Sequence, residues 1–166
     1  MTGLTEGTHT LKLLATGTKR PGTFGDVFSI VDRFLVGVTL EEDSTKITYD
    51  GWAGKANARA SRGTYRQGKS KTLGATCGTF RGPQIDLITA KDPTRGTARV
   101  RVQDPSTETW VRDFQVDLSS RRVEWQYFVS VIELDPNKIY RLEVTSDDGA
   151  PVVFDGCAGT VVGRLN

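Results

Sequence analysis

The sequence predicts an all-β fold, a two-sheet β-sandwich preceded by a β-hairpin that repeats the closing strands of such a unit. Two observations support this fold class. Short stretches of alternating apolar and polar residues recur along the chain, and Gly, Pro, Asn and Asp stand between them. In addition, residues 3–13 and 30–34 run parallel to residues 133–144 and 153–157 when Pro136 is treated as an insertion. The repeat places Leu4, His9, Leu11, Leu13 and Asp32 opposite Leu134, Tyr140, Leu142, Val144 and Asp155.

The repeat divides the 166-residue chain into two parts. We predict a β-hairpin with its linker over residues 1–40 and a complete sandwich over residues 41–166. Two strands cannot bury a core alone. The apolar side chains of the hairpin, among them Leu11, Leu13 and Phe34, are therefore expected to dock on the sandwich or on a neighbouring chain, which favours a homo-oligomer.

Eight or nine stretches of the sandwich region have the length and alternation of strands, and this number is enough for a closed jelly roll. They cover residues 46–49, 63–66, 72–80, 84–90, 97–103, 110–118, 124–134, 139–145 and 152–162. Residues 50–62 are rich in Gly, Ala, Asn and Ser and are expected to form an irregular loop. No helix is predicted.

The alternation also predicts which side chains face the core. In residues 97–103, Ala98, Val100 and Val102 share one face, so this strand should be half-buried. In residues 110–118, the same two-residue period places Trp110 with the apolar residues. Trp125 also lies on a predicted strand. Because aromatic residues contribute heavily to the interior of a sandwich, both Trp110 and Trp125 are expected in the core.

Charge and cysteine content restrict the class of protein. The net charge is only +2 with both signs interspersed, which argues against a nucleic-acid-binding protein. No apolar stretch is long enough for membrane insertion, and the N-terminus lacks a signal peptide. The two cysteines, Cys77 and Cys157, lie far apart without metal-ligand partners, and we interpret them as free, buried thiols.

No catalytic constellation is visible. His9 is the single histidine, and no glycine-flanked nucleophilic serine accompanies it, so we predict a protein that is not an enzyme. No cofactor is expected beyond a structural calcium ion, since Asp and Asn side chains in turns can bind one. The weak calcium candidates are Asp135, Asn137, Asp147 and Asp148.

The aromatic residues of the glycine-rich loop are the best candidates for ligand binding. Trp52 and Tyr65 lie in or beside this loop, where no strand periodicity places them in the core. An exposed indole can stack on a sugar ring or anchor a protein contact. Arg62, Arg66 and Asn57 could supply the polar groups around it.

Several stretches together resemble a known group of modules. These are Gly51-Trp52, Gly63-Thr64-Tyr65-Arg66, the run from Gly74 to Gly82, the run from Thr94 to Val102, and Ile139-Tyr140-Arg141-Leu142-Glu143-Val144. They resemble the galactose-binding-like, carbohydrate-binding-module-type jelly rolls of bacterial surface proteins and of phage tail or capsid appendages. The resembling positions are turns and core residues, so the resemblance implies a fold more than an activity.

Two functions are consistent with this resemblance. The first is a non-enzymatic structural or attachment module of a bacteriophage virion, which binds protein neighbours or a cell-surface glycan; it fits the missing signal peptide. The alternative is a carbohydrate-binding accessory module of a secreted bacterial hydrolase or adhesin. Either function places the protein on a virion or at an extracellular surface.

Overall fold

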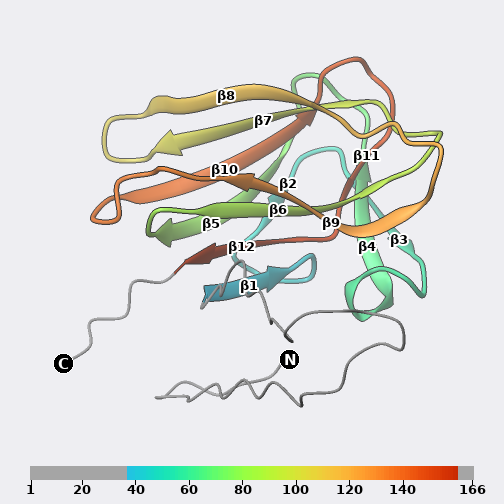
Figure 1. Ribbon diagram of the computed structural model, residues 1–166, viewed down its shortest axis with the longest axis horizontal. Helices are drawn as coiled ribbons and strands as arrows, with labels where there is room; N and C mark the ends of the chain where they lie inside the picture. The colour runs from blue at the N-terminus through green and yellow to red at the C-terminus, as the bar shows by residue number, and fades with distance from the viewer. Residues whose placement is uncertain (1–36, 161–166) are drawn as a thin grey trace, which may run out of the picture. The chain divides into compact units, whose positions relative to one another are not determined.

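The computed structural model describes residues 37–160, which form a β-sandwich of antiparallel sheets (Figure 1). The predicted all-β fold is thus confirmed, whereas the predicted N-terminal hairpin, up to residue 36, lies outside the described residues. Residues 37–40, predicted as linker, belong instead to a strand, and so do residues 53–56 of the predicted irregular loop. The strands are β1 (Gly37–Glu41), β2 (Thr48–Tyr49), β3 (Ala53–Ala56), β4 (Thr64–Gly68), β5 (Ala75–Arg81), β6 (Ile85–Lys91), β7 (Thr97–Asp104), β8 (Thr109–Asp117), β9 (Glu124–Val131), β10 (Ile139–Ser146), β11 (Val152–Phe154) and β12 (Gly156–Thr160). One 3-10 turn, η1 (Ser61–Gly63), precedes β4.

The strands form three sheets. A four-stranded sheet has the order β1-β12-β6-β9, a five-stranded sheet the order β2-β5-β10-β7-β8, and a three-stranded sheet the order β11-β4-β3. At the right of Figure 1, β4 runs across the direction of the strands in the two larger sheets. In the part of the chain that the structure describes, no helix is long and apolar enough to cross a membrane.

The core lies between the inner faces of the four- and five-stranded sheets. The alternation predicted for β7 is confirmed, because Ala98, Val100 and Val102 are fully buried while the side chains between them face outward. Ile85 and Leu87 of β6 belong to the same buried cluster. Each sheet therefore hides one apolar face against the other, which is the packing of a β-sandwich.

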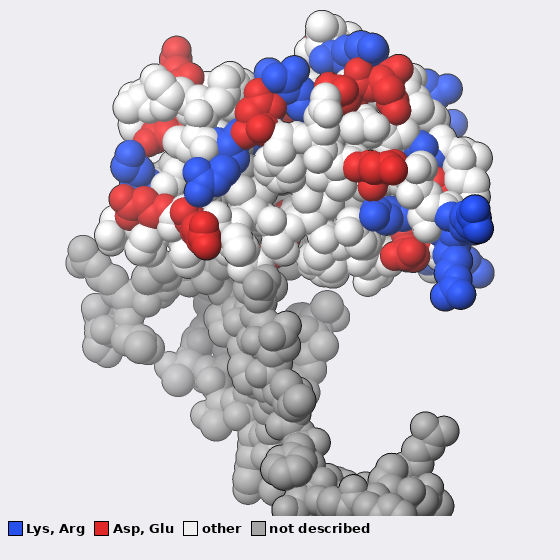
Figure 2. Space-filling model, turned by 45° about the horizontal axis from the view of Figure 1, so that its top comes forward, with Lys and Arg blue, Asp and Glu red and all other residues white. Residues whose placement is uncertain are grey.

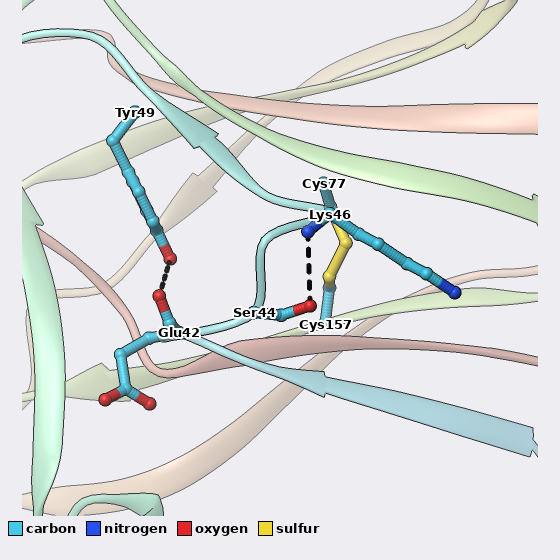
Figure 3. Close-up of a disulfide and its surroundings, with 6 residues drawn as sticks. All are labelled: Glu42, Ser44, Lys46, Tyr49, Cys77 and Cys157. Carbon is cyan, nitrogen blue, oxygen red and sulfur yellow. Dashed lines mark hydrogen bonds between the residues drawn. A yellow bond between two sulfur atoms is a disulfide. The ribbon is translucent and has the colours of Figure 1, made fainter.

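The prediction of free thiols is wrong, because Cys77 and Cys157 form a disulfide (Figure 3). Cys77 lies on β5 of the five-stranded sheet and Cys157 on β12 of the four-stranded sheet. Their Cα atoms are 6.5 Å apart, within the range that a disulfide spans. Their separation of 80 residues hid this proximity, which only the pairing of distant strands creates. The bond links the two sheets through the core.

Two β-bulges lie at the same level of the five-stranded sheet. On β8, Val111 is an extra residue, because Val102 pairs with Arg112 but Gln103 pairs with Trp110. On β5, Gly78 is extra at the corresponding position of the pairing with β10. A side chain at Gly78 would place its Cβ 2.9 Å from the carbonyl oxygen of Lys46, so this bulge requires glycine.

The bulge at Val111 corrects the prediction for Trp110. One extra residue interrupts the two-residue period, so the side chains on the two sides of a bulge follow opposite alternations. Trp110 therefore points outward from the sheet, and its side chain is 42% exposed rather than buried in the core. Trp125 is half-buried and packs edge-on against Tyr65, with ring centroids 5.1 Å apart.

We expect the disulfide to contribute strongly to stability. It closes a loop of 80 residues, for which the chain-entropy model gives about 4.5 kcal/mol. Reduction with dithiothreitol should therefore lower the midpoint of chemical unfolding substantially. Peptide mapping without reductant should recover Cys77 linked to Cys157, and equal unfolding midpoints with and without reductant would contradict this role.

Candidate functional site

Trp52, the first of the sequence-based candidates, is not a surface platform. Its side chain is only 8% exposed and packs at right angles to the ring of Phe154, with centroids 6.4 Å apart. Its indole N–H donates to the carbonyl of Leu73 at 3.3 Å. The indole lies against Gly68, where any Cβ would collide with it. Trp52 directly precedes β3, and the pairing of β3 with β4 brings it next to Gly68. Because glycine has no side chain, it leaves room there for the indole.

The other candidates from the glycine-rich loop point in different directions. Tyr65 and Arg66 are neighbours on β4, so their side chains lie on opposite faces of the strand. Tyr65 packs on Trp125, whereas the Arg66 guanidinium lies 5.0 Å from the ring of Tyr49. Exposed Arg62 pairs with Asp43 at 3.7 Å, and Asn57 accepts the N–H of Arg59 at 2.9 Å. The structure does not gather these residues around Trp52, and their role in binding stays a prediction.

The three aspartates among the calcium candidates are engaged in hydrogen bonds within the protein. Asp135 accepts the backbone N–H of Asn137 at 2.9 Å, and Asp148 accepts that of Thr97 at 2.7 Å. Asp147 accepts a hydrogen bond from a glutamine side chain of β8. Among residues 37–160, no group of three or more His, Cys, Asp or Glu side chains is arranged to hold a metal ion. A structural calcium ion remains a prediction without support from these residues.

A cluster of carboxylates that the sequence analysis missed surrounds Asp155. This fully buried side chain accepts the backbone N–H of Ser61 at 2.9 and 3.1 Å. Burial, together with the negative charges of Glu41 and Glu42, raises the pKa of Asp155 to about 6, against the opposing effect of the hydrogen bond from Ser61. Glu42 accepts a hydrogen bond from the hydroxyl of Thr64, and its other carboxylate oxygen is buried without a partner. The raised pKa means that Asp155 takes up a proton in mildly acidic solution.

The outer face of the five-stranded sheet carries a row of polar side chains beside the exposed Trp110. One residue from each of four neighbouring strands pairs with the next across the sheet: Trp110 of β8, Gln103 of β7, Arg141 of β10 and Thr79 of β5. We call these four residues the Trp110 row. It lies immediately beyond the two bulges, and three strand spacings give it a length of about 14 Å.

Ion pairs and a cation–π contact fix the side chains beside the row. The guanidinium of Arg101 lies 4.5 Å from the centroid of the Trp110 ring and donates to Glu143, while its Nε is buried without a partner. Arg99 donates two hydrogen bonds to Asp113, at 2.8 and 2.7 Å. These hydrogen bonds hold the pKa of the Asp113 carboxyl below its ordinary value. The face around Trp110 is thus ordered before any ligand arrives.

The charges elsewhere on the surface are mixed. Figure 2 shows Lys and Arg side chains next to Asp and Glu in several places, and no broad area of one sign is visible in that view. A shallow, open depression lies at the loops before β7 and β9, lined by Pro93, Ser119, Ser120 and Arg121. None of these four lining residues is aromatic, so the depression lacks a flat ring surface like that of Trp110.

Solved structures with a similar fold include several carbohydrate-active proteins. A two-domain esterase (CEX) active on acetylated mannans, co-crystallised with mannopentaose, is 14% identical and aligns with a TM-score of 0.55 over 78% of this chain and 38% of its own. The family two carbohydrate esterase from Cellvibrio japonicus is 10% identical, with a TM-score of 0.53 over 78% and 35% of the two chains. The catalytic domain of a GH87 α-1,3-glucanase in complex with tetrasaccharides is 11% identical, with a TM-score of 0.52 over 80% and 29%.

These comparisons show a shared fold. The chain spans little more than a third of the length of the two esterases, and less of the glucanase. No model of a known protein family matches the sequence, and no curated protein matches it at a significant level. What the structure shares with its neighbours is therefore a β-sandwich architecture that occurs in carbohydrate-active proteins.

We expect Trp52→Ala to destabilise the protein strongly. Removing a buried indole leaves a cavity, and such truncations cost about 3–5 kcal/mol. The measurement is the free energy of unfolding by chemical denaturation. Trp110→Ala is the matched control, since truncation of an exposed indole should cost less than about 1 kcal/mol. Equal losses for the two variants would contradict the burial of Trp52.

Asp155→Asn should change how stability depends on pH. The pKa of Asp155 is about 6 in the folded protein against an ordinary value of 3.8, so the folded state binds more protons between these pH values. Wild-type stability therefore falls as the pH rises from about 4 to 6, by on the order of 2–3 kcal/mol from this group. The asparagine variant lacks this loss.

The stability of both proteins should be measured from pH 4 to pH 8 in buffer with EDTA. We expect the stability of the variant relative to wild type to increase across this range and to level off above about pH 7. Replacement of one of the two acceptor oxygens by an amide NH2 group adds a constant offset, which does not depend on pH. A difference that stays constant from pH 4 to pH 8 would show that Asp155 titrates normally.

Proposed function

We propose that the described sandwich is a carbohydrate-binding module whose ligand surface is the outer face of the five-stranded sheet around Trp110. The observation that carries this proposal is the bulge at Val111, which displays an indole on a polar face where the strand alternation would bury it. The fold shared with carbohydrate-active proteins supports it. The proposal corresponds to the alternative function expected from the sequence, and a place in a phage particle stays a prediction.

The position of Trp110 is unfavourable for stability alone. Burying a large apolar side chain contributes about 1.5–3 kcal/mol, and an outward-facing indole forgoes part of this. Bulges next to binding sites re-aim side chains in this way. An exposed indole offers a flat apolar surface to the C–H groups of a sugar ring, and its ring edge still carries an N–H donor.

Polar groups along the row suit the hydroxyl groups of a sugar chain. Gln103 donates its side-chain N–H to the carbonyl of Glu108 at 3.1 Å, which fixes the amide and leaves its oxygen for a ligand. Thr79 is exposed at the other end of the row and can both donate and accept. Because these side chains are already held, binding requires little further ordering of the protein. In this proposal the module binds glycan and performs no catalysis.

The decisive variant is Trp110→Ala. Its binding should be measured by calorimetry against oligosaccharides of acetylated mannan, galactan and α-1,3-glucan. We expect affinity for whichever glycan binds to fall by about thirtyfold or more, which corresponds to the loss of a hot-spot residue. Melting temperatures should show that the variant remains folded.

Phe128→Ala provides the matched control. Phe128 is also an exposed aromatic residue, with 51% of its surface accessible, but it lies on β9 of the four-stranded sheet. Its truncation should leave glycan affinity unchanged. The proposal fails if no glycan binds the wild-type protein, or if Trp110→Ala binds as tightly as wild type.

A further inference from the structure

We infer that the glycan bound by the Trp110 face is an anionic polysaccharide, recognised through Arg81 and Arg141. This inference rests on the proposed function and specifies its ligand class. Arg141 lies in the middle of the Trp110 row, between Gln103 of β7 and Thr79 of β5. Arg81 lies two residues beyond Thr79, on the same face of β5. The register makes the two arginines diagonal neighbours, about 7–8 Å apart across the strand pair.

These two arginines differ from the others on the same face. Arg99 is paired with Asp113, and Arg101 with Glu143. Within residues 37–160, by contrast, no carboxylate lies within ion-pair distance of Arg81 or Arg141. The carboxylate nearest along β10, that of Glu143, is already engaged by Arg101.

The face therefore carries an uncompensated positive charge next to its exposed aromatic residue. Like charges on neighbouring strands repel, and a bound anion removes this repulsion. Arg141 is half-buried between its strand neighbours, which limits the positions that its guanidinium can reach. A guanidinium presents paired N–H donors that match the two oxygens of a carboxylate or a sulfate.

The spacing of these groups fits a chain of sugars better than a single one. Trp110 on β8 and Arg141 on β10 are two strand spacings apart, about 10 Å. A sugar ring stacked on Trp110 would thus place a later unit of the same chain over the arginines. The anionic groups of that unit are uronate carboxylates or sulfate esters, which share the same recognition chemistry.

The test compares two anionic glycans with a neutral one, and the uronate and its carboxyl-reduced form differ only in charge. Oligogalacturonate, carboxyl-reduced oligogalacturonate of the same length and a sulfated galactan oligosaccharide are titrated into the full chain at low and at high salt. We expect at least one anionic form to bind tenfold or more tightly than the neutral form. This preference should shrink as NaCl is raised from 50 to 500 mM, because salt screens exposed charges.

The double variant Arg81→Gln/Arg141→Gln should abolish the preference for the anionic form and leave weak binding of the neutral form intact. Its matched control is Arg121→Gln/Arg122→Gln, which removes the same charge from exposed residues of the β8–β9 loop. Loss of the preference in this control would show unspecific attraction and overturn the inference. The carboxylate and the sulfate arms identify which anionic group is recognised.

The remaining outcomes separate the two proposals. Equal affinity for neutral and anionic glycans, lost in Trp110→Ala, would overturn the inference and leave the proposed function in place. Binding of the anionic form that survives Trp110→Ala but not the arginine variant would overturn the proposed function and show an anion site without sugar stacking. Absence of binding to every probe would overturn both.

Discussion

The contact between the inner faces of the two larger sheets determines the rest of the structure. Each sheet has one apolar face, and the side chains of β6, β7 and β10 fill the space between them. The Cys77–Cys157 disulfide ties the sheets together at this contact. Because the inner faces are fixed in this way, the outer face of the five-stranded sheet is a rigid surface on which exposed side chains keep their positions.

The sequence predicted most of the strands, because alternation with a period of two is a local signal. The half-buried pattern of β7 is an example. It missed the short strands β1 and β3, and it joined β11 and β12, which belong to different sheets, into one strand. The prediction failed where one residue breaks the period. Val111 gives no local sign that it is a bulge residue, so Trp110 was assigned to the core. The bulge exists only in the pairing of β8 with β7, and this pairing leaves no pattern in the sequence of β8 itself.

Other failures involved contacts between residues far apart in the chain. Trp52 lies in a glycine-rich stretch that resembles a surface loop, but the hairpin of β3 and β4 brings it over Gly68. A glycine within a predicted strand was the available signal for such a close approach. For Asp155, the available signal was an acidic residue directly after the apolar run Val152-Val153-Phe154. Its burial depends on Ser61, which is 94 residues away in the sequence.

The two bulges have a consequence for how this surface can evolve. They lie at one level on β5 and β8, on either side of the regular pair of β7 and β10. The start of β8 therefore shows Trp110 or Val111 to solvent according to whether the bulge is present. Pairing of the same residues without the bulge would bring Val111 opposite Gln103 and turn Trp110 to the inner side of the sheet. Loss of a single codon at Val111 would instead make the pairing regular and keep Trp110 opposite Gln103. In homologous proteins, a strand that is one residue shorter at this level can thus display the same indole on the outer face.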